Sequence, residues 1–321
     1  MSAMKKRFYG LSIFIIPVAL FALFSLTTNG FGVHSIAVVL NQTMLPTAMG
    51  LGLCVAMLAG MNDLAIGVKV IFGAVVGGML SKSWGMAGLI LGCFGGAMLG
   101  ALVQAVFYRT LRIPSMVLSL GIIMIYEVAA SLVCGAAAYV GIPSGISAVG
   151  SYPYNIIVLL LAGTFFYVVF YHTPIGLQIK AIGSDERLCK NMGVKADKVK
   201  FLAYIISAVI CGFASILNIC YSGMVSVQTN MSTLSLVFKP IMGALIGMQL
   251  VRVLDNLPLL VFIGELCIQI IFNGFIAMGL SDAWQNVMLG LFILVIVFLT
   301  GEHAPNIAKI RKAMKQMAFS A

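Results

Sequence analysis

Charged residues are scarce in this chain. Asp, Glu, Lys and Arg make up 9% of its 321 residues, whereas they make up about 25% of an ordinary soluble domain. Hydrophobic residues make up 61% of the chain. This composition excludes a soluble globular protein and indicates an integral membrane protein.

Residues that bind metals or form disulfides are few and dispersed. The seven cysteines show no C-x-x-C spacing, and the three histidines lie far apart. Zinc sites need clustered ligands, and disulfide frameworks are typical of short secreted chains. The sequence therefore predicts neither, and the cysteines are interpreted as small packing residues.

Signatures of catalysis and nucleotide binding are missing as well. The chain has no G-x-x-x-x-G-K-[ST] phosphate loop, no G-x-S-x-G elbow and no H-E-x-x-H pair. We therefore expect no enzyme activity and no cofactor here, with any ATP and magnesium on a separate ATPase subunit. The net charge of +10 predicts no nucleic-acid partner, because anionic lipid headgroups facing cytoplasmic basic residues account for it.

Long apolar runs recur along the whole chain. Most are about 20 residues long, which is what an α-helix needs to cross a hydrocarbon core of about 30 Å. They do not alternate as the strands of a β-barrel do. We predict an all-α integral membrane protein with one transmembrane domain over residues 1–321. Its ten helices are expected near 8–28, 35–59, 62–80, 85–107, 113–134, 154–171, 200–219, 234–250, 257–278 and 282–300. Interruptions at 59–64 and 250–257 leave nine to eleven spans open.

Lysine and arginine determine the predicted orientation, since cytoplasmic loops are enriched in them. With ten spans, both termini lie on the side that carries nearly all of the 19 basic residues, while Lys82 and Lys239 lie on the other and Lys69 lies inside a helix. Both termini, including a basic tail over 301–321, are therefore predicted to be cytoplasmic. An uncleaved first helix is preferred to a signal peptide, because the chain continues as TTNG after Leu26 without a small-x-small cleavage site.

The charge that the chain does have is concentrated in one loop. Residues 173–200 hold nine of its 28 charged residues. Ser184 can cap a short helix, with Asp185 and Glu186 in the first turn, where carboxylates favour the positive end. Gly193 can end it. The pattern predicts a helix of about two turns outside the membrane.

This predicted helix carries a small apolar face. Leu188 and Met192 lie four residues apart and therefore on one side, with Arg187 and Lys190 beside them. Such a helix is suited to insertion into a groove of another protein. The residues alone do not decide between a docking element and a solvated loop whose charges only set the topology.

The sequence of this loop resembles a known family. It reads T-P-I-G-L-Q-I-K-A-I-G-S-D-E and, further on, M-G-V-K-A-D-K-V-K. This closely resembles a segment of permease subunits in ABC importers of the ribose and simple-sugar type, where it is the cytoplasmic coupling helix that docks on the ATPase. The residues that take the family's positions are Thr173, Gly176, Ala181, Gly183, Gly193 and Lys198, while Ser184 to Glu186 replace the usual Gly-Asn-Glu.

A second segment strengthens the resemblance. Ala48 to Gly67 reads AMGLGLCVAMLAGMNDLAIG and is similar to the family's A-x-G-x-x-x-V-x-x-x-G-I-D-L-S-V-G, with Asp63, Leu64 and Gly67 in place. The match covers roughly residues 35–220. After the eighth helix the chain lacks the family's usual glycine-rich loop, so its C-terminal third is divergent.

The resemblance implies a function and partners. It implies a permease subunit in a bacterial cytoplasmic membrane that forms the path for a monosaccharide or related small polar solute by alternating access. The implied partners are an ABC ATPase subunit, a second permease subunit in a homodimer or heterodimer, and an extracytoplasmic substrate-binding protein. Nucleosides and branched-chain amino acids are the alternative substrates.

Polar residues within apolar helices are candidates for the path or its gates. Burying such groups in a membrane is unfavourable unless they are paired or face water. Glu265, Gln269 and Asn273 recur every four residues and therefore share one face of a predicted helix. The alternative is that they form hydrogen bonds between helices.

Two further acids belong to the same candidate set. Glu127 stands where the resembled family usually has Arg-Gly, and structural pairing is its alternative role. Asp63 is interpreted as a structural or gating residue that pairs with a cytoplasmic basic residue such as Arg109 or Arg112.

Glycines form a bare face on one predicted helix. Gly88, Gly92, Gly96 and Gly100 recur every four residues. A face without side chains predicts the close approach of a second helix backbone.

Two other functional classes are consistent with an apolar multi-span chain. An ion-coupled secondary transporter or channel acting alone needs intramembrane acids, and Asp63, Glu127 and Glu265 could supply them. A non-transporting membrane scaffold would show no substrate flux. The missing phosphate loop and the resemblance favour the importer subunit.

Overall fold

The computed structural model describes residues 3–28, 31–135, 138–251 and 254–281, and 284–294 without 286 and 293. The long helices in these ranges are α1 (Ala3–Thr27), α2 (His34–Leu58), α3 (Ile66–Leu111), α4 (Ser115–Cys134), α6 (Tyr154–His172), α9 (Ala196–Ser222), α10 (Ser235–Leu250) and α11 (Leu257–Ala277). The short elements are β1 (Tyr139–Gly141), α5 (Ser144–Ser147), η1 (Ala148–Gly150), α7 (Pro174–Ser184), α8 (Glu186–Asn191), β2 (Met224–Ser226) and η2 (Ser232–Leu234). The first nine predicted helices coincide with the long helices to within several residues, and most of the predicted span 282–300 and the tail 301–321 lie outside the described residues.

Seven helices among the described residues are long and apolar enough to cross a membrane, which makes the chain a multi-pass membrane protein. They are α2, α3, α4, α6, α9, α11 and the segment Ser232–Leu250 that contains α10. The 46 residues of α3 are about twice what one crossing requires. At Gly85 the backbone leaves the helical conformation, with φ 59° and ψ −137°, which glycine adopts without strain. Gly85 therefore divides α3 into the two helices that the sequence predicts.

The two halves of α3 pack against each other through glycine. A Cβ on Gly92 would lie 2.5 Å from the Cα of Gly77, and a Cβ on Gly96 would lie 2.9 Å from the Cα of Gly73. Side chains at these positions would force the two halves apart. The close approach predicted for this glycine face is confirmed, and its partner is the first half of the same element.

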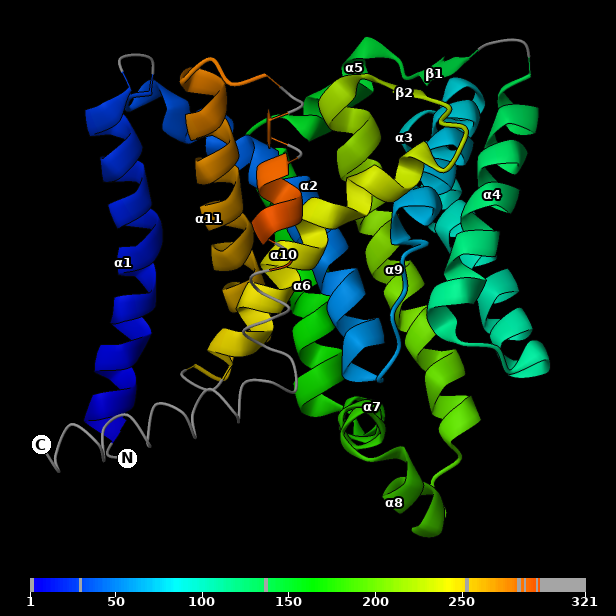
Figure 1. Ribbon diagram of the computed structural model, residues 1–321. Helices are drawn as coiled ribbons and strands as arrows, with labels where there is room; N and C mark the ends of the chain where they lie inside the picture. The colour runs from blue at the N-terminus through cyan, green and yellow to red at the C-terminus, as the bar shows by residue number, and fades with distance from the viewer. Residues whose placement is uncertain are drawn as a thin grey trace, which may run out of the picture.

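Different elements cover the two ends of the helical bundle (Figure 1). α7 and α8 lie at one end, here named the loop end, and α1 also begins there. β1, β2 and α5 lie at the opposite end, here named the strand end. The strands pair antiparallel, with Val140 opposite Val225. The sequence pattern does not predict this pair, because three residues are too few to show a period of two.

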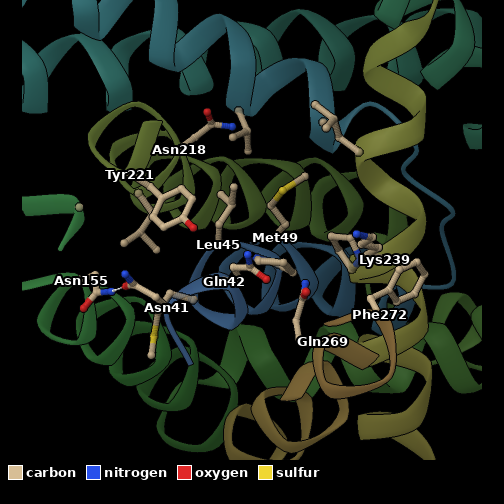
Figure 2. Close-up of a pocket in the computed structure, with 18 of the residues that line it drawn as sticks. Asn41, Gln42, Leu45, Met49, Asn155, Asn218, Tyr221, Lys239, Gln269 and Phe272 are labelled. Carbon is tan, nitrogen blue, oxygen red and sulfur yellow. Dashed lines mark hydrogen bonds between the residues drawn. The ribbon is translucent and has the colours of Figure 1, made fainter. Parts of the chain in front are cut away.

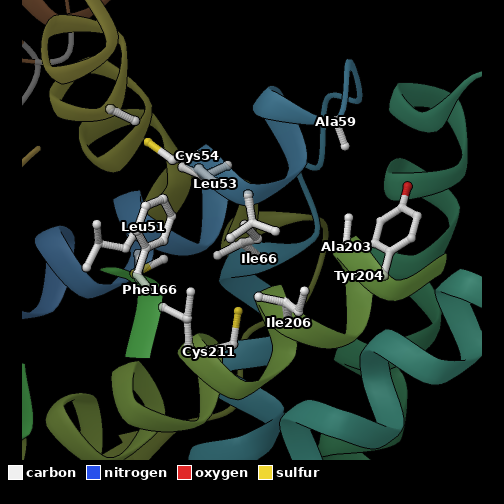
Figure 3. Close-up of a cluster of buried hydrophobic side chains, with 14 of the residues drawn as sticks. Leu51, Leu53, Cys54, Ala59, Ile66, Phe166, Ala203, Tyr204, Ile206 and Cys211 are labelled. Carbon is white, nitrogen blue, oxygen red and sulfur yellow. The ribbon is translucent and has the colours of Figure 1, made fainter. Parts of the chain in front are cut away.

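The largest apolar core lies where α2, α3, α6 and α9 meet (Figure 3). Leu51 and Leu53 of α2, Ile66 of α3 and Phe166 of α6 are at most 2% exposed. Lipid tails are as apolar as these side chains, so close packing rather than the hydrophobic effect holds such helices together. This core holds α2 and α9 in place, and both helices also line the polar cavity described below.

Candidate functional site

A cavity of about 360 Å³ lies between α2, α9, α10 and α11. Its polar lining consists of Asn41, Gln42, Asn155, Asn218, Tyr221, Ser235, Lys239, Gln269 and Asn273. Figure 2 shows side chains from these four helices and from α6 around one space. The lining therefore combines amides and hydroxyls with one lysine, and it includes no aspartate or glutamate among the described residues.

The cavity occupies the half of the bundle nearer the strand end. Its residues come from the first half of α2, the start of α6 and α10, and the last turns of α9 and α11. α2 ends at the loop end, where the carbonyl of Leu58 lies against Gly183 of α7. α11 begins at the same end, where the amide of Leu257 donates to the Tyr171 hydroxyl at 3.2 Å. The cavity is thus separated from the loop end by the packed half of the bundle.

Side chains of the cavity are joined across helices. The Asn273 amide of α11 donates to Oε1 of Gln42 on α2 at 2.8 Å. The amide of Asn155 donates to Oδ1 of Asn41, which Figure 2 marks with a dashed line. These bonds hold hydrogen-bonding groups at fixed positions on the wall, so the cavity suits a solute that presents several hydroxyls or other polar groups.

The lysine of the cavity is also held in place. Nζ of Lys239 lies 4.2 Å from the centroid of the Phe272 ring, and Figure 2 shows the two side chains next to each other. A cation over an aromatic face is attracted by the negative charge of the ring face. Lys239 therefore contributes positive charge at one end of the cavity.

The predicted polar face of α11 divides between the cavity and the packed interior. Gln269 and Asn273 line the cavity. Glu265 is fully buried and does not line it. The adjacent amides Asn41 and Gln42 were not singled out as candidates, although two amides within the apolar run 35–59 are the signal that could have identified them.

Asp63 pairs with a lysine, so the expected partner Arg109 or Arg112 is wrong. Nζ of Lys69 lies 2.5 Å from Oδ2 of Asp63, and both side chains are fully buried. Both arginines are exposed near the end of α3, whereas Lys69 lies in the first turn of α3, six residues after Asp63. The Gln104 amide also donates to Asp63, at 2.9 Å.

Asp63 also holds the start of α3 inside the bundle. Its Oδ1 accepts the backbone N–H of Ala65 at 3.0 Å. Met61 and Asp63, in the non-helical stretch before α3, are each 1% exposed. A helix start within a membrane leaves N–H groups that need acceptors, and the carboxylate of Asp63 supplies one.

Glu127 plays the corresponding part at the start of α10. Its two carboxylate oxygens accept the backbone N–H groups of Met231 at 2.8 Å and Thr233 at 3.0 Å. The Thr233 hydroxyl donates to the same carboxylate at 2.7 Å. Glu127 does not line the cavity. Its contacts are those of a residue that fixes η2 and the start of α10.

The charged loop forms two short helices, α7 and α8, where one was predicted. The predicted cap Ser184 is instead the last residue of α7, and its hydroxyl donates to the carbonyl of Lys180 at 3.1 Å. Asp185 was predicted in the first turn but is the N-cap of α8, and it accepts the backbone N–H of Leu188 at 3.0 Å. The prediction missed α7 although its start has a local signal, because Thr173 is a favourable N-cap and Pro174 lies in the first turn, where proline is tolerated.

The positions that carry the resemblance have structural roles in α7. Thr173 is its N-cap, and its Oγ1 accepts the Gly176 N–H at 3.4 Å. A Cβ on Gly176 would lie 2.5 Å from the Val169 carbonyl oxygen, and a Cβ on Gly183 would lie 2.0 Å from that of Leu58. These two glycines therefore let α7 pack directly against the ends of α6 and α2.

The charged loop has exposed apolar side chains on both of its helices. Leu188 of α8 is 57% exposed, and Met192, the residue that follows α8, is 75% exposed, in agreement with the predicted apolar face. Leu177 of α7, which the sequence did not single out, is 66% exposed. The flanking residues Ala181, Arg187 and Lys198 are exposed too, and Gly193 follows α8 with φ 85°. Cys189 is 7% exposed and faces the bundle.

An ion-pair network attaches α8 to the membrane helices. Glu186 lies 2.7 Å from Lys190 and 2.8 Å from Lys200 on α9. Nζ of Lys200 also donates to the hydroxyl of Tyr108 on α3 at 3.3 Å. Movement of α8 is therefore linked to both α9 and α3.

This attachment is expected to weaken in acid. Hydrogen bonds from Lys190 and then Lys200 lower the pKa of Glu186 below its ordinary value. A lowered pKa means that the network stabilises α8 above the unfolded pKa of about 4.3 and loses this effect as pH falls through the folded pKa. The protection of residues 186–192 against hydrogen exchange, taken relative to the intrinsic exchange rate at each pH, should fall below about pH 4.3, by less than tenfold because the pair is partly exposed. Glu186→Gln should remove this pH dependence, and an unchanged profile in that variant would contradict the assignment.

Known proteins similar to this chain are membrane permeases. A family model for the permease component of the branched-chain amino acid transport system matches residues 35–297. The autoinducer 2 import system permease protein of Enterobacter sp. strain 638 is 25% identical over 324 residues, which covers 96% of this chain and 91% of the relative. No solved structure matches the chain.

Two sugar permeases of Escherichia coli strain K12 are similar over a smaller share of the chain. The ribose import permease protein is 24% identical and covers 86% of this chain and 88% of its own length. The galactofuranose transporter permease protein is 23% identical, and the match covers 84% of this chain and 81% of the relative. The family match over residues 35–297 extends the resemblance of the charged loop to most of the chain, which therefore belongs to the family of the branched-chain amino acid transport system permease component.

Proposed function

We propose that this chain is the permease subunit of an ABC importer for a monosaccharide or a related small polar solute. Its similarity to permeases named for autoinducer 2, galactofuranose and ribose supports this substrate class. A second permease subunit completes the path in a homodimer or heterodimer, an ATPase binds at the loop end, and an extracytoplasmic binding protein delivers the solute at the strand end. ATP and magnesium are bound by the ATPase and not by this chain.

The proposal includes ten spans in one transmembrane domain over residues 1–321. The two halves of α3 count separately, α1 adds one span, and the predicted span 282–300 adds the last. An even number of spans places both termini at the loop end, which the concentration of lysine and arginine in residues 173–200 marks as cytoplasmic. The cavity then faces the outside of the cell.

The lining of the cavity is the main structural support for the proposed substrate class. Amides of Gln42, Gln269 and Asn273 offer both donors and acceptors, which matches the hydroxyls of a sugar. An amino acid would bring an ammonium group that needs a carboxylate, and none lines the cavity among the described residues. A nucleoside is the closest alternative, because Tyr221 and Phe272 offer aromatic surface.

The mechanism follows from the two ends of the bundle. In the described conformation the cavity lies on the strand-end side, and α10 and α11 pack closely between it and the loop end. α7 and α8 would transmit closure of the ATPase pair through the contacts of Gly183 with α2 and of Glu186 with α9. Such coupling requires that the nucleotide states of the ATPase differ in their contacts with this loop.

Substitution of the amides of the cavity tests the proposed substrate class. Asn273→Leu and Gln42→Leu each leave the other partner without its hydrogen bond and remove a contact for a hydroxyl. A lost polar contact of this kind costs about 1–2 kcal/mol. We expect ATP-driven uptake of radiolabelled pentoses and hexoses to fall about tenfold, with unchanged recovery of the ATPase complex.

Thr43→Val is the matched control for this measurement. Thr43 is the neighbour of Gln42 and is fully buried, and its hydroxyl donates to its own helix at Val39. This variant should transport within about twofold of the native chain. Equal loss in Thr43→Val and Gln42→Leu would show that the cavity does not contact the solute.

A further inference from the structure

A buried carboxyl group that makes no hydrogen bond within the described residues lies just beyond the cavity. Glu265 is 0% exposed, and neither of its carboxyl oxygens has a hydrogen-bond partner in the part of the chain that the structure describes. Asp63 and Glu127, the other two acids inside the described bundle, each accept several hydrogen bonds. Buried polar groups in folded proteins nearly always have hydrogen-bond partners, so the lack of hydrogen bonds at Glu265 in this conformation requires a physical explanation.

Glu265 continues the polar face of α11 towards the loop end. It lies four residues before Gln269 and eight before Asn273, and both of these line the cavity. Four residues of helix rise about 6 Å along the axis. A solute that leaves the cavity along this face towards the loop end therefore meets Glu265 next.

The carboxyl group is enclosed at a glycine-lined contact between helices. A Cβ on Gly243 of α10 would lie 2.2 Å from Cδ of Glu265, and a Cβ on Gly50 of α2 would lie 3.2 Å from its Oε1. On the same contact, a Cβ on Gly264 would lie 2.6 Å from the carbonyl oxygen of Gly243. Backbones in direct contact through glycine present smooth surfaces, so α10 can separate from α11 here without disengaging large side chains.

We propose that Glu265 contacts the solute in the conformation that opens towards the loop end, where it accepts hydrogen bonds from solute hydroxyls. In the outward-facing conformation α2 and α10 cover the carboxyl group and close the path beneath the cavity. When α10 moves away from α11 at Gly243, the carboxyl group faces the opened path. This assignment rests on the proposed importer function, and it extends the binding face of α11 by one turn.

Accessibility of position 265 tests this assignment in the assembled importer. Glu265→Cys is placed in the complete complex in inverted membrane vesicles, which expose the loop end. It is treated with a membrane-impermeant cationic methanethiosulfonate, without nucleotide and after trapping with ATP and vanadate. We expect the modification rate to differ at least tenfold between the two nucleotide states. The native chain is the control, because its Cys54 and Cys267 are buried and should stay unmodified. A rate equal to that of the native chain in both states would overturn the assignment.

A second pair of variants applies if Glu265→Cys does not assemble. Glu265→Gln keeps hydrogen-bonding capacity and should retain uptake within threefold, whereas Glu265→Met should lose at least tenfold while it still co-purifies with the ATPase. Normal uptake by Glu265→Met would show that the carboxyl group only fills space. Absence of ATP-driven uptake in the native chain contradicts the importer function itself, while native uptake with normal Glu265→Met contradicts only the role of Glu265.

Discussion

Arg187→Glu combined with Met192→Asp is expected to abolish co-purification of the ATPase with this chain in detergent. Met192 is 75% exposed and lies beside the exposed Leu188 on α8, so in the proposed complex it is buried against the ATPase. A carboxylate there would be desolvated without a partner, and reversal of the charge at Arg187 adds electrostatic repulsion at an interface suited to a cation. Loss of a central contact of this kind costs at least about 2 kcal/mol, or about thirtyfold in affinity.

The matched control places the same change at the opposite end of the bundle. Met224 in β2 is 56% exposed, so Met224→Asp alters surface polarity and charge without approaching α8. The ATPase should co-purify with this variant at the native level. If the double variant on α8 also retains the ATPase while it stays folded, the loop only sets the topology and the docking role of α8 is wrong.

Asp63→Asn is expected to destabilise the folded chain by about 3–5 kcal/mol, because it leaves Lys69 as an unpaired charge in the buried interior. Both side chains of this pair are fully buried, with 2.5 Å between Nζ and Oδ2. The asparagine still accepts the N–H of Ala65, so the loss would come mainly from the charge. The unfolding temperature in detergent should fall by several degrees.

Removal of both charges distinguishes the effect of the unpaired charge on stability from the effect of the changed side-chain shape. Asp63→Asn together with Lys69→Met eliminates the unpaired charge and should recover much of the lost stability, since neutral replacements of buried ion pairs are often tolerated. An equally low unfolding temperature in the single and double variants would contradict a dominant role for the charge of Lys69.

Most of the helices could be predicted because a helix that crosses the bilayer needs an apolar run of a certain length, and such runs are visible in the sequence. Apolar runs of about 20 residues gave nine of the predicted helices, and the glycines from Gly88 to Gly100 indicated the tight contact within α3. The sequence did not show that α3 and α10 begin inside the bundle. Those starts depend on carboxylates supplied by distant residues, as Glu127 does for Thr233.

The candidate site was only partly predictable, because the cavity is assembled from distant segments. Gln269 and Asn273 could be identified since their spacing of four residues places them on one face. Gln42 was missed, although it accepts a hydrogen bond from Asn273 at 2.8 Å, because no local pattern links residues 231 positions apart. The predicted partner of Asp63 was wrong for a related reason: orientation rules place lysines outside the membrane, whereas Lys69 is buried inside the bundle.

The functional prediction was based mainly on the sequence motif of the charged loop, residues 173–200. Its glycines are placed by close backbone contacts of α7 with α2 and α6, which local propensities do not reveal. The family match over residues 35–297 confirms the resemblance to permease subunits. The docking role of α8 and the contact role of the cavity are proposals that the variants above test.

The most direct test of the proposed importer function is a measurement of solute uptake by the reconstituted complex. The chain is purified with its ATPase and second permease subunit and placed in proteoliposomes with the binding protein outside and ATP inside. We predict uptake of a radiolabelled neutral sugar that requires internal ATP and stops when the ATPase subunit is omitted. Uptake by this chain without the ATPase, driven by an ion gradient and lost in Glu265→Gln, would contradict the importer account and identify a stand-alone ion-coupled transporter.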